Sequence, residues 1–426
     1  MKKINIITLG CAKNVVDSEH LAGALSRGYQ IVFDDEMLDS EVVVINTCGF
    51  ILDAKQESVD MILRAVGART EGSIKELYVM GCLSERYADD LRTEIPEVDQ
   101  FFGVNDFSKI VERLGVPLGE TSRKLTTPPH YAYLKISEGC AWRCGYCAIP
   151  LIRGGHRSVP IEELMAEAKD LAARGVKELI VIAQDTTFYG MDLYGERCLA
   201  KLLTALCQID GIEWIRLHYT YPAAFPGDVI EVISRQKKIC RYIDIPFQHI
   251  ADHVLSAMHR HISKAQTLAL IAELRDRIPG LALRTTLLVG YPGESEADFA
   301  ELVDFVKTAK IDRLGVFPYS AEEGTFSAEN LVDDVPSDEK ERRAEKIMAL
   351  QAEVALELNE RKVGQCFRVI VDRREGDYFV ARTEFDSPEV DPEVLILADG
   401  HELCPGEFYQ IEIISADQYD IYGRIL

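Results

Sequence analysis

The sequence predicts an α/β protein of three parts: an N-terminal doubly wound α/β domain, a central partial (β/α)6 barrel and a small all-β barrel. In residues 1–118, short apolar runs alternate with helical patterns, as in open parallel sheets. In 131–335, six strand-like runs alternate with amphipathic helices, two units fewer than a closed eightfold barrel. In 363–426, glycines separate short strands, as in small β-barrels.

Length and composition indicate a multi-domain chain in a reducing compartment. The 426 residues are long enough for two or three cores, and 47% hydrophobic with 27% charged residues is ordinary for a globular protein. The 11 cysteines are few for this length and odd in number, which favours a cytoplasmic, metal-binding protein over a disulfide framework. The start resembles a short signal peptide, but we interpret it as a buried strand. We expect no membrane association, because no apolar run reaches 18 residues.

The N-terminal part predicts three buried parallel strands with a helix after each of them. The strands are Ile4–Leu9, Glu41–Asn46 and Glu76–Met80, and the helices are Asn14–Ser26, Ala54–Val66 and Leu83–Arg92.

Three cysteines of this part each follow the end of a predicted strand. They are Cys11, Cys48 and Cys82. Because the carboxyl ends of parallel strands meet at one edge of a sheet, the three thiols can converge on one crevice. Three unrelated buried thiols are the alternative, since cysteine often packs as a small hydrophobic residue.

Residues 119–130 are rich in Thr, Ser and Pro and predict a linker. The six strands expected after it are Tyr131–Ser137, Glu178–Gln184, Glu213–Tyr219, Tyr242–Ile245, Leu281–Val289 and Arg313–Tyr319. The helices between them include Ile161–Arg174, Leu199–Gln208, Gly227–Arg235, Lys264–Arg277 and Glu296–Ala309. Because chemistry in such barrels lies at the carboxyl ends of the strands, we expect the site there.

The loop after the first of these strands contains three cysteines within eight residues, Cys140, Cys144 and Cys147. Soft thiolate ligands favour zinc or an iron–sulfur cluster. A closed zinc site needs a fourth ligand, and the next cysteine, Cys198, is distant in sequence. A four-iron cluster on three thiolates keeps one iron open for a substrate. A structural zinc site or a redox dithiol is the alternative.

The last two segments are a connecting helix over 336–362, which Ser337 is expected to cap, and a five-stranded domain over 363–426. This last domain contains 14 acidic and 5 basic side chains, so it lacks the basic patch that nucleic-acid binding requires. Five further cysteines are expected to pack as small hydrophobic residues: Cys198, Cys207, Cys240, Cys366 and Cys404. The expected strands are Cys366–Asp372, Tyr378–Thr383, Val394–Leu397, Tyr409–Ser415 and Tyr419–Ile425.

The cysteine spacing of the central part, with Tyr146 before the last cysteine, resembles the radical S-adenosylmethionine (SAM) superfamily. The resemblance implies a 4Fe-4S cluster that chelates SAM and cleaves it to a radical that abstracts hydrogen from a substrate carbon. Segment 287–294 is similar to the one the superfamily places beside the SAM adenosine, which makes Gly290 and Glu294 candidate contacts. Tyr146 could lie near the adenine or pack in the core. Arg153 could bind the SAM carboxylate or make structural ion pairs.

The whole chain resembles the methylthiotransferase family of radical SAM enzymes. The resemblance implies a second 4Fe-4S cluster on Cys11, Cys48 and Cys82, where the sulfur is thought to be held, and a TRAM-like substrate-recognition domain over 363–426. The matching segments are Thr8-Leu9-Gly10-Cys11, Asn46-Thr47-Cys48, Gly81-Cys82, Ser137-Glu138-Gly139-Cys140, Cys147-Ala148-Ile149-Pro150 and Arg153-Gly154.

The family has two branches. One modifies an adenosine of tRNA (MiaB-type), and the other modifies the β-carbon of an aspartate in small-ribosomal-subunit protein twelve (RimO-type). The acidic last domain favours the basic ribosomal protein and argues against direct RNA binding. Within it, the acids of Glu384-Phe385-Asp386-Ser387-Pro388-Glu389-Val390-Asp391 are the expected docking charges. We expect an electron donor such as a flavodoxin or ferredoxin. The non-catalytic alternative is an iron–sulfur electron carrier, which would need fully ligated clusters.

Overall fold

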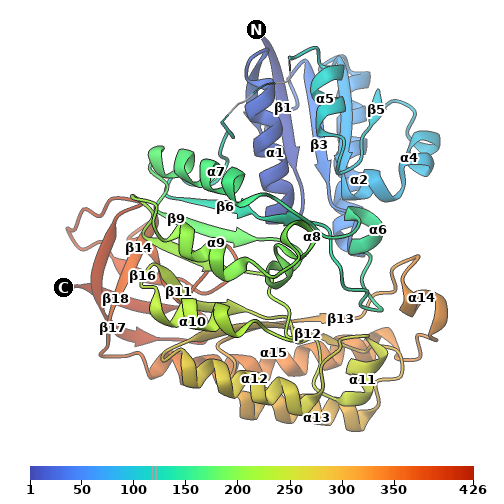
Figure 1. The fold of residues 1–426 in the computed structure, drawn as a ribbon. Coiled ribbons are helices and arrows are strands. Elements are labelled where there is room, and N and C mark those ends of the chain that lie inside the picture. Colours follow the sequence, from blue (N-terminus) through green and yellow to red (C-terminus); the bar gives the residue numbers. More distant parts are fainter. Residues whose placement is uncertain (118, 120–121) are drawn as a thin grey trace.

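The computed structural model describes residues 1–117, 119 and 122–426, and they form two large sheets, a closed barrel and a small two-stranded sheet. Figure 1 shows the N-terminal sheet in blue, the central sheet beneath it and the C-terminal barrel in orange and red. The expected α/β architecture with a small β-barrel is confirmed. Part of the linker expected at 119–130 lies outside the described residues, and its described residues form no helix or strand.

The N-terminal sheet has five parallel strands in the order β2-β1-β3-β4-β5. The sequence predicted only the three central strands, because the edge strands are half-exposed or very short and lack a continuous apolar run. The strands are β1 (Lys2–Thr8), β2 (Tyr29–Phe33), β3 (Val42–Thr47), β4 (Glu76–Gly81) and β5 (Gln100–Phe101).

Helices cover both faces of this sheet, and each face has its own buried apolar cluster beneath the helices. The single helix expected over Leu83–Arg92 is wrong: it is two helices that break at Tyr87, whose φ of −124° and ψ of 29° are not helical. The helices are α1 (Ala12–Leu25), α2 (Leu52–Thr70), α3 (Cys82–Arg86), α4 (Ala88–Glu94) and α5 (Phe107–Arg113).

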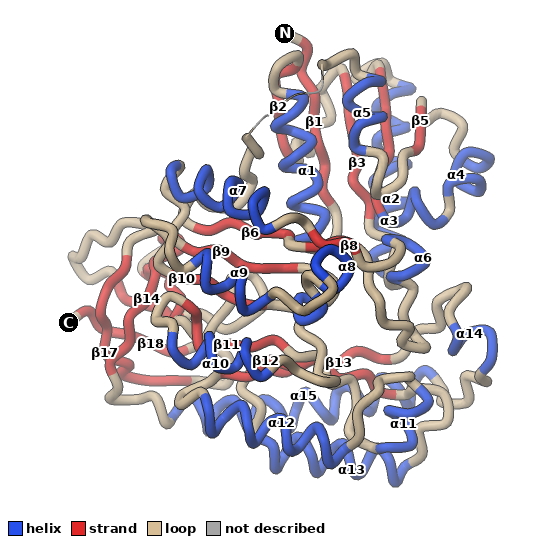
Figure 2. The backbone as a smooth tube through the Cα atoms, in the orientation of Figure 1, coloured by secondary structure: helices blue, strands red, loops and turns tan. Residues whose placement is uncertain are grey.

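The central sheet has six parallel strands in the order β13-β12-β11-β10-β9-β6, so the expected open barrel of six units is confirmed. The largest apolar core lies between this sheet and its outer helices, which Figure 2 shows along one side of the sheet. The strands are β6 (Tyr131–Lys135), β9 (Glu178–Ile182), β10 (Trp214–Leu217), β11 (Ile239–Asp244), β12 (Ala282–Val289) and β13 (Arg313–Pro318). The outer helices are α7 (Ile161–Ala173), α9 (Leu199–Leu206), α10 (Gly227–Arg235), α12 (Lys264–Arg277) and α13 (Glu296–Ala309).

Shorter elements fill the loops at the carboxyl ends of these strands. They are β7 (Ser137–Glu138), α6 (Ile149–Arg153), β8 (Arg157–Ser158), η1 (Thr186–Phe188), α8 (Met191–Tyr194), α11 (Asp252–Ala257) and α14 (Phe326–Asn330).

The long helix α15 (Ser337–Glu360) packs beside β13 and α13 and buries Ile347 in the main core. The expectation that Ser337 caps it is wrong. Pro336 is the N-cap, and Ser337 is the first helical residue with no side-chain cap bond. Because Ser337 already lies inside the first turn, its hydroxyl is not at the N-cap position from which a side chain accepts the first free N–H groups.

The C-terminal domain is a closed five-stranded barrel in the order β14-β15-β16-β18-β17, as expected. Cys366 and Cys404 are exposed, so the expectation that they pack inside is wrong for these two, whereas Cys198, Cys207 and Cys240 are buried. The strands are β14 (Cys366–Glu375), β15 (Tyr378–Thr383), β16 (Val394–Leu397), β17 (Phe408–Ala416) and β18 (Ile421–Ile425).

Candidate functional site

The three N-terminal cysteines come together at one edge of the N-terminal sheet. Cys11, Cys48 and Cys82 follow β1, β3 and β4, which are neighbours in the sheet. The Cys82 thiol lies 3.9 Å from Asn14 Oδ1, and Asn14 Nδ2 donates to the carbonyl of Thr47, the residue before Cys48. The structure therefore brings the three cysteines together at this edge of the sheet, and their binding of a cluster stays a prediction.

Gly10 makes the close approach of Cys11 and Cys48 possible. Its φ of +91° is a left-handed conformation that favours glycine, and a Cβ there would stand 3.1 Å from Cys48 Sγ. A larger residue at this position would push the Cys48 thiol away from the crevice.

The second set of cysteines occupies the loop after β7, at the carboxyl end of the central sheet. Cys140, Cys144 and Cys147 are half-buried, and the Cys147 N–H donates to the Cys144 carbonyl at 3.0 Å, which tightens the loop. Burial raises the pKa of the Cys140 and Cys147 thiols to about 12. Metal binding must displace these protons, since thiolate is the ligand form.

The two sets of cysteines lie against each other across the boundary between the N-terminal part and the barrel. Cys82 packs in one apolar cluster with Ala148, the residue after Cys147, and with Ile152 of α6. This contact places the two sets of cysteines next to each other at the boundary of the two parts, which the sequence alone did not predict.

Each set has an arginine beside one of its thiols. Burial raises the pKa of the Cys82 thiol to about 11, and the neighbouring Arg153 guanidinium opposes that rise. Arg260 donates to Cys144 Sγ at 3.4 Å. A buried cation next to a thiol stabilises the thiolate, so each set presents free thiols and a counter-charge.

These donor sets fit iron–sulfur clusters. In the described part of the chain, no three His, Cys, Asp or Glu side chains close around a point tightly enough to hold one metal ion. A four-iron cube is several atoms wide and separates its thiolate ligands, so sets of three spaced thiols with a buried cation suit it.

Sequence reasoning missed four residues that line the mouth of the barrel. Trp142 donates to Asp185 Oδ2 at 2.6 Å and stacks on Tyr221 with ring centroids 4.1 Å apart. The Arg260 guanidinium lies 4.4 Å from the centroid of the Tyr221 ring, and Arg260 also donates to Cys144 Sγ. Asp185 and Tyr221 follow β9 and β10, a position that could have marked them, but Arg260 lies in a loop without any such signal.

The predicted SAM contacts Gly290 and Glu294 form one buried unit at the end of β12. The Gly290 N–H donates to Glu294 Oε2 at 2.6 Å, and Glu294 Oε1 accepts from Arg343 of α15 at 2.9 Å. Burial raises the pKa of Glu294, with the Arg343 charge opposing it. Gly290 has φ of +70°, and a Cβ would stand 2.2 Å from Lys340 Cγ, so the turn requires glycine.

Tyr146 packs against the apolar cluster of Met258 and Tyr291, and its hydroxyl accepts from Arg260 at 3.3 Å. It therefore has core contacts and also stands beside the second set of cysteines. A role next to the adenine of SAM stays a prediction.

Arg153 is a buried ion-pairing residue. Its guanidinium lies 3.2 Å from Asp17 Oδ2 on α1, 2.8 Å from Glu138 Oε1 on β7 and 2.5 Å from Asn14 Oδ1. These contacts join the N-terminal part to the central barrel, as expected if Arg153 makes structural ion pairs. Binding of the SAM carboxylate by Arg153 stays a prediction.

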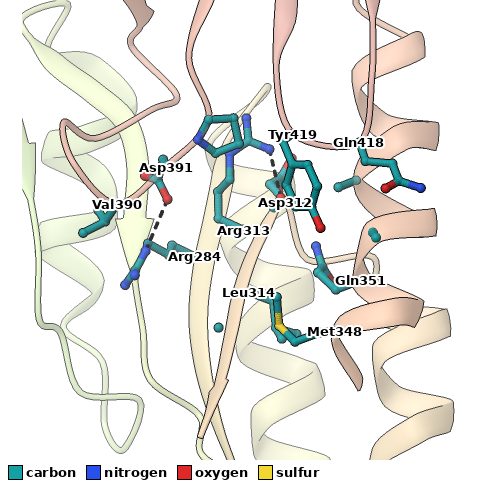
Figure 3. Close-up of a pocket in the computed structure, with 14 residues that line it drawn as sticks. Arg284, Asp312, Arg313, Leu314, Met348, Gln351, Val390, Asp391, Gln418 and Tyr419 are labelled. Carbon is teal, nitrogen blue, oxygen red and sulfur yellow. Dashed lines mark hydrogen bonds and ion pairs between the residues drawn. The ribbon is translucent and has the colours of Figure 1, made fainter. Parts of the chain in front are cut away.

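The acids expected to dock a basic protein are largely used inside the molecule. Asp386 pairs with Arg313 at 2.5 Å, and Asp391 pairs with Arg284 at 3.3 Å. The side chains of both aspartates and of Arg313 are nearly fully buried, whereas that of Arg284 is partly exposed. Figure 3 shows Arg284 reaching Asp391 beside a cavity of about 290 Å³ between β13, α15 and the C-terminal barrel. The expectation that these two aspartates are docking charges is wrong. They attach the C-terminal barrel to the central sheet, and the cavity lies away from the cysteines.

Three family descriptions match consecutive parts of the chain. The radical SAM superfamily matches residues 134–306, the uncharacterized protein family UPF0004 matches 3–103, and the TRAM domain matches 363–426. Among solved structures, the radical SAM methyltransferase TsrM from Kitasatospora setae has a TM-score of 0.56 at 12% identity, covering 88% of this chain and 79% of that one. This similarity shows the fold alone. The fold and the cysteine-lined crevice define a radical SAM protein.

Full-length relatives are more specific. Ribosomal protein uS12 methylthiotransferase RimO from Phocaeicola vulgatus is 52% identical over 99% of both chains, and that from Flavobacterium johnsoniae is 54% identical over 99% of this chain and 98% of its own. The chain belongs to this RimO family and is a radical SAM methylthiotransferase. The assignment favours the protein-modifying branch over the tRNA-modifying one and over an electron carrier. No helix in the described residues has the length and apolarity to cross a membrane.

Proposed function

We propose that this chain adds a methylthio group to the β-carbon of an aspartate in ribosomal protein uS12. The relatives that support the proposal carry uS12 methylthiotransferase in their names. The observation that carries it is the contact of Cys82 with Ala148, because it places the two sets of cysteines next to each other at the boundary of the two parts. A sulfur held by one set and a hydrogen-abstracting centre at the other must both reach the same substrate carbon.

The proposed cofactors are SAM and two 4Fe-4S clusters, one on Cys11, Cys48 and Cys82 and one on Cys140, Cys144 and Cys147. When bound, they supply the one-electron chemistry that removes a hydrogen atom from an unreactive carbon and the sulfur that replaces it. The chain contributes the thiolate ligands, and Arg153 and Arg260 offset their charge.

Residues at the mouth of the barrel position the reactants and exclude water. The stacked rings of Trp142 and Tyr221 form an apolar wall that Asp185 and Arg260 hold in place. Glu294 accepts from two backbone N–H groups, those of Gly290 and Tyr291, and so fixes the turn proposed to lie beside the SAM adenosine. A rigid, dry wall of this kind keeps a reactive centre from side reactions.

The remaining proposals concern partners. Electrons come from a donor such as a flavodoxin or ferredoxin in the cytoplasm. The C-terminal barrel recognises the basic uS12 protein through acids that stay exposed and have no partner among the described residues, such as Asp377, Asp399 and Glu402. Direct RNA binding is not part of the proposal, because the net charge of the chain is −23.

Two triple variants test the division of labour between the cysteine sets. After anaerobic reconstitution the wild-type chain should hold about eight irons, and replacing either set with alanine should leave about four. The Cys140/Cys144/Cys147 variant should lose SAM cleavage. The Cys11/Cys48/Cys82 variant should retain some SAM cleavage but form no methylthiolated uS12. Full iron content in the second variant, or product from it, would contradict the proposal. Replacing the buried Cys198, Cys207 and Cys240 with alanine is the matched control and should leave about eight irons.

A further inference from the structure

Lys13 is a buried lysine with no acidic partner in the described part of the chain. Its exposed fraction is 8%, and it lies in the first turn of α1, two residues after Cys11. Among the described residues, the ammonium makes a cation–π contact with Tyr219, whose ring centroid lies 3.0 Å from Nζ. A buried cation without a counter-charge is costly, so its presence here needs an explanation.

The neighbouring acids are occupied by other cations. On α1, Asp17 is paired with Lys135 and Arg153, and Glu19 is paired with Arg123. The first turn of α1 contains no acidic residue. A cation at a helix N-terminus also opposes the helix dipole, so neither its neighbours nor its helix stabilise the Lys13 charge.

Lys13 lies where the first turn of α1 packs on the central sheet, because Ala12, Val15 and Tyr219 share one apolar cluster there. Tyr219 follows β10 at the carboxyl edge of the central sheet, and its φ of +55° is a strained backbone conformation for a bulky residue. The backbone there is held by two hydrogen bonds, from Tyr219 N to Asp244 Oδ2 at 3.0 Å and from Thr186 N to the Tyr219 carbonyl at 2.9 Å. The aromatic face therefore holds the ammonium in a fixed place between the N-terminal cysteines and the barrel mouth.

The ammonium is not fully sealed inside the protein. Within the described residues Nζ donates no hydrogen bond, but it is not one of the fully buried side-chain atoms that lack a partner. A small anionic group can thus reach it. The proposed reaction brings one such group to this crevice, because its target carbon is bonded to a carboxylate.

We propose that Lys13 binds the carboxylate of the target aspartate and thereby selects an acidic side chain and positions its β-carbon. This inference rests on the proposed function, because it takes uS12 as the substrate. A charged contact formed in a desolvated crevice fixes orientation, and orientation decides which hydrogen is removed. Tyr219 is a positioning residue that holds the ammonium until substrate arrives.

The test compares binding of two forms of uS12 to the anaerobically reconstituted full chain. One is unmodified uS12 with its target aspartate, and the other has asparagine there, which has the same shape without the charge. The wild-type chain should bind the aspartate form on the order of 30-fold more tightly, the size expected for a desolvated charge pair. Lys13→Met should lose this preference, Lys13→Arg should keep most of it, and the exposed control Lys109→Met should keep the wild-type ratio.

Each outcome decides the inference. Equal binding of the two uS12 forms by the wild-type chain would overturn it without any variant. Lys13→Met weakening both forms equally would show a merely structural role and also overturn it. Iron content and circular dichroism check that Lys13→Met is folded. If uS12 from a strain lacking the chain still carries the methylthio group, the proposed function fails instead, and the two failures are thus distinguishable.

Discussion

At the scale of single residues, Arg153 joins two parts of the molecule that are far apart in sequence. It pairs with Asp17 of α1 and Glu138 of β7, and only 2% of its side chain is exposed. Burial would lower its pKa, but Asp17 and Glu138 raise that pKa well above its usual value. Such a pair contributes specificity to the interface, and removing one partner leaves a buried charge.

Arg153→Met should lower the free energy of unfolding by about 1–3 kcal/mol, because Asp17 and Glu138 lose this partner and keep Lys135. Urea unfolding of the cluster-free chain measures it. Arg153→Lys should recover part of the loss, since it keeps the charge but loses the fork geometry. A raised Kd for SAM with unchanged stability would instead favour the SAM-carboxylate role.

The sequence indicated the six cysteines proposed to hold the clusters, because each stands at a strand end or within a short spacing. It could not indicate Arg260 or Lys13 in the same way. Arg260 reaches Cys144 across 116 positions of sequence, and Lys13 meets Tyr219 only after α1 docks on the barrel. Contacts of this kind arise from tertiary packing and leave no local pattern.

At the scale of elements, the segment from Glu384 to Asp391 attaches the C-terminal barrel to the central sheet. Besides the aspartate pairs, Glu389 accepts from the Tyr131 and Tyr133 hydroxyls, and Ser387 Oγ lies 2.9 Å from His218 Nε2. The sequence showed the acids but not their arginine partners on β12 and β13. The sequence therefore predicted a docking surface, whereas in the structure this segment forms the contact between the C-terminal barrel and the central sheet.

Asp386→Asn should destabilise the chain by about 3 kcal/mol at neutral pH, because it leaves Arg313 buried and unpaired. Burial would raise the pKa of Asp386, but the Arg313 and Lys362 charges hold it below its ordinary value. The contribution is thus fully present above the unfolded pKa of about 4 and is lost as the pH falls through the lower folded pKa. Urea midpoints of wild type and variant should converge as the pH is lowered from about 5 to 3.

The matched control is Glu402→Gln, which removes one exposed acid of the same barrel and should change stability by less than about 0.5 kcal/mol. A gap between wild type and Asp386→Asn that widens on acidification would contradict the sign of this pKa shift.

The strands show what local pattern can predict. The six strands of the central sheet are parallel and mostly buried, and the sequence located each of them within a few residues. The edge strand β2 is half-exposed, and β5 has only two residues, so neither presents such a run. The break at Tyr87 was also invisible, because the helical pattern continues through it.

At the scale of the whole molecule, the central part contacts both of the other parts of the chain. The N-terminal part contains one set of cysteines and Lys13, and the central part contains the other set and Tyr219. The C-terminal barrel is joined to the central sheet through Asp386 and Asp391. Under the proposed function, this arrangement brings the cysteine sets and the substrate-recognition domain together in one chain.

The mass of uS12 tests the central claim most directly. Intact-protein mass spectrometry would compare uS12 from three strains: the parent, one lacking this chain, and the latter complemented with the Cys11/Cys48/Cys82 alanine variant. We predict that only the parent's uS12 carries one methylthio group in place of one hydrogen, located by fragmentation on an aspartate. Identical uS12 masses in all three strains, together with a tRNA that loses its methylthio-adenosine in the deletion strain, would contradict the account.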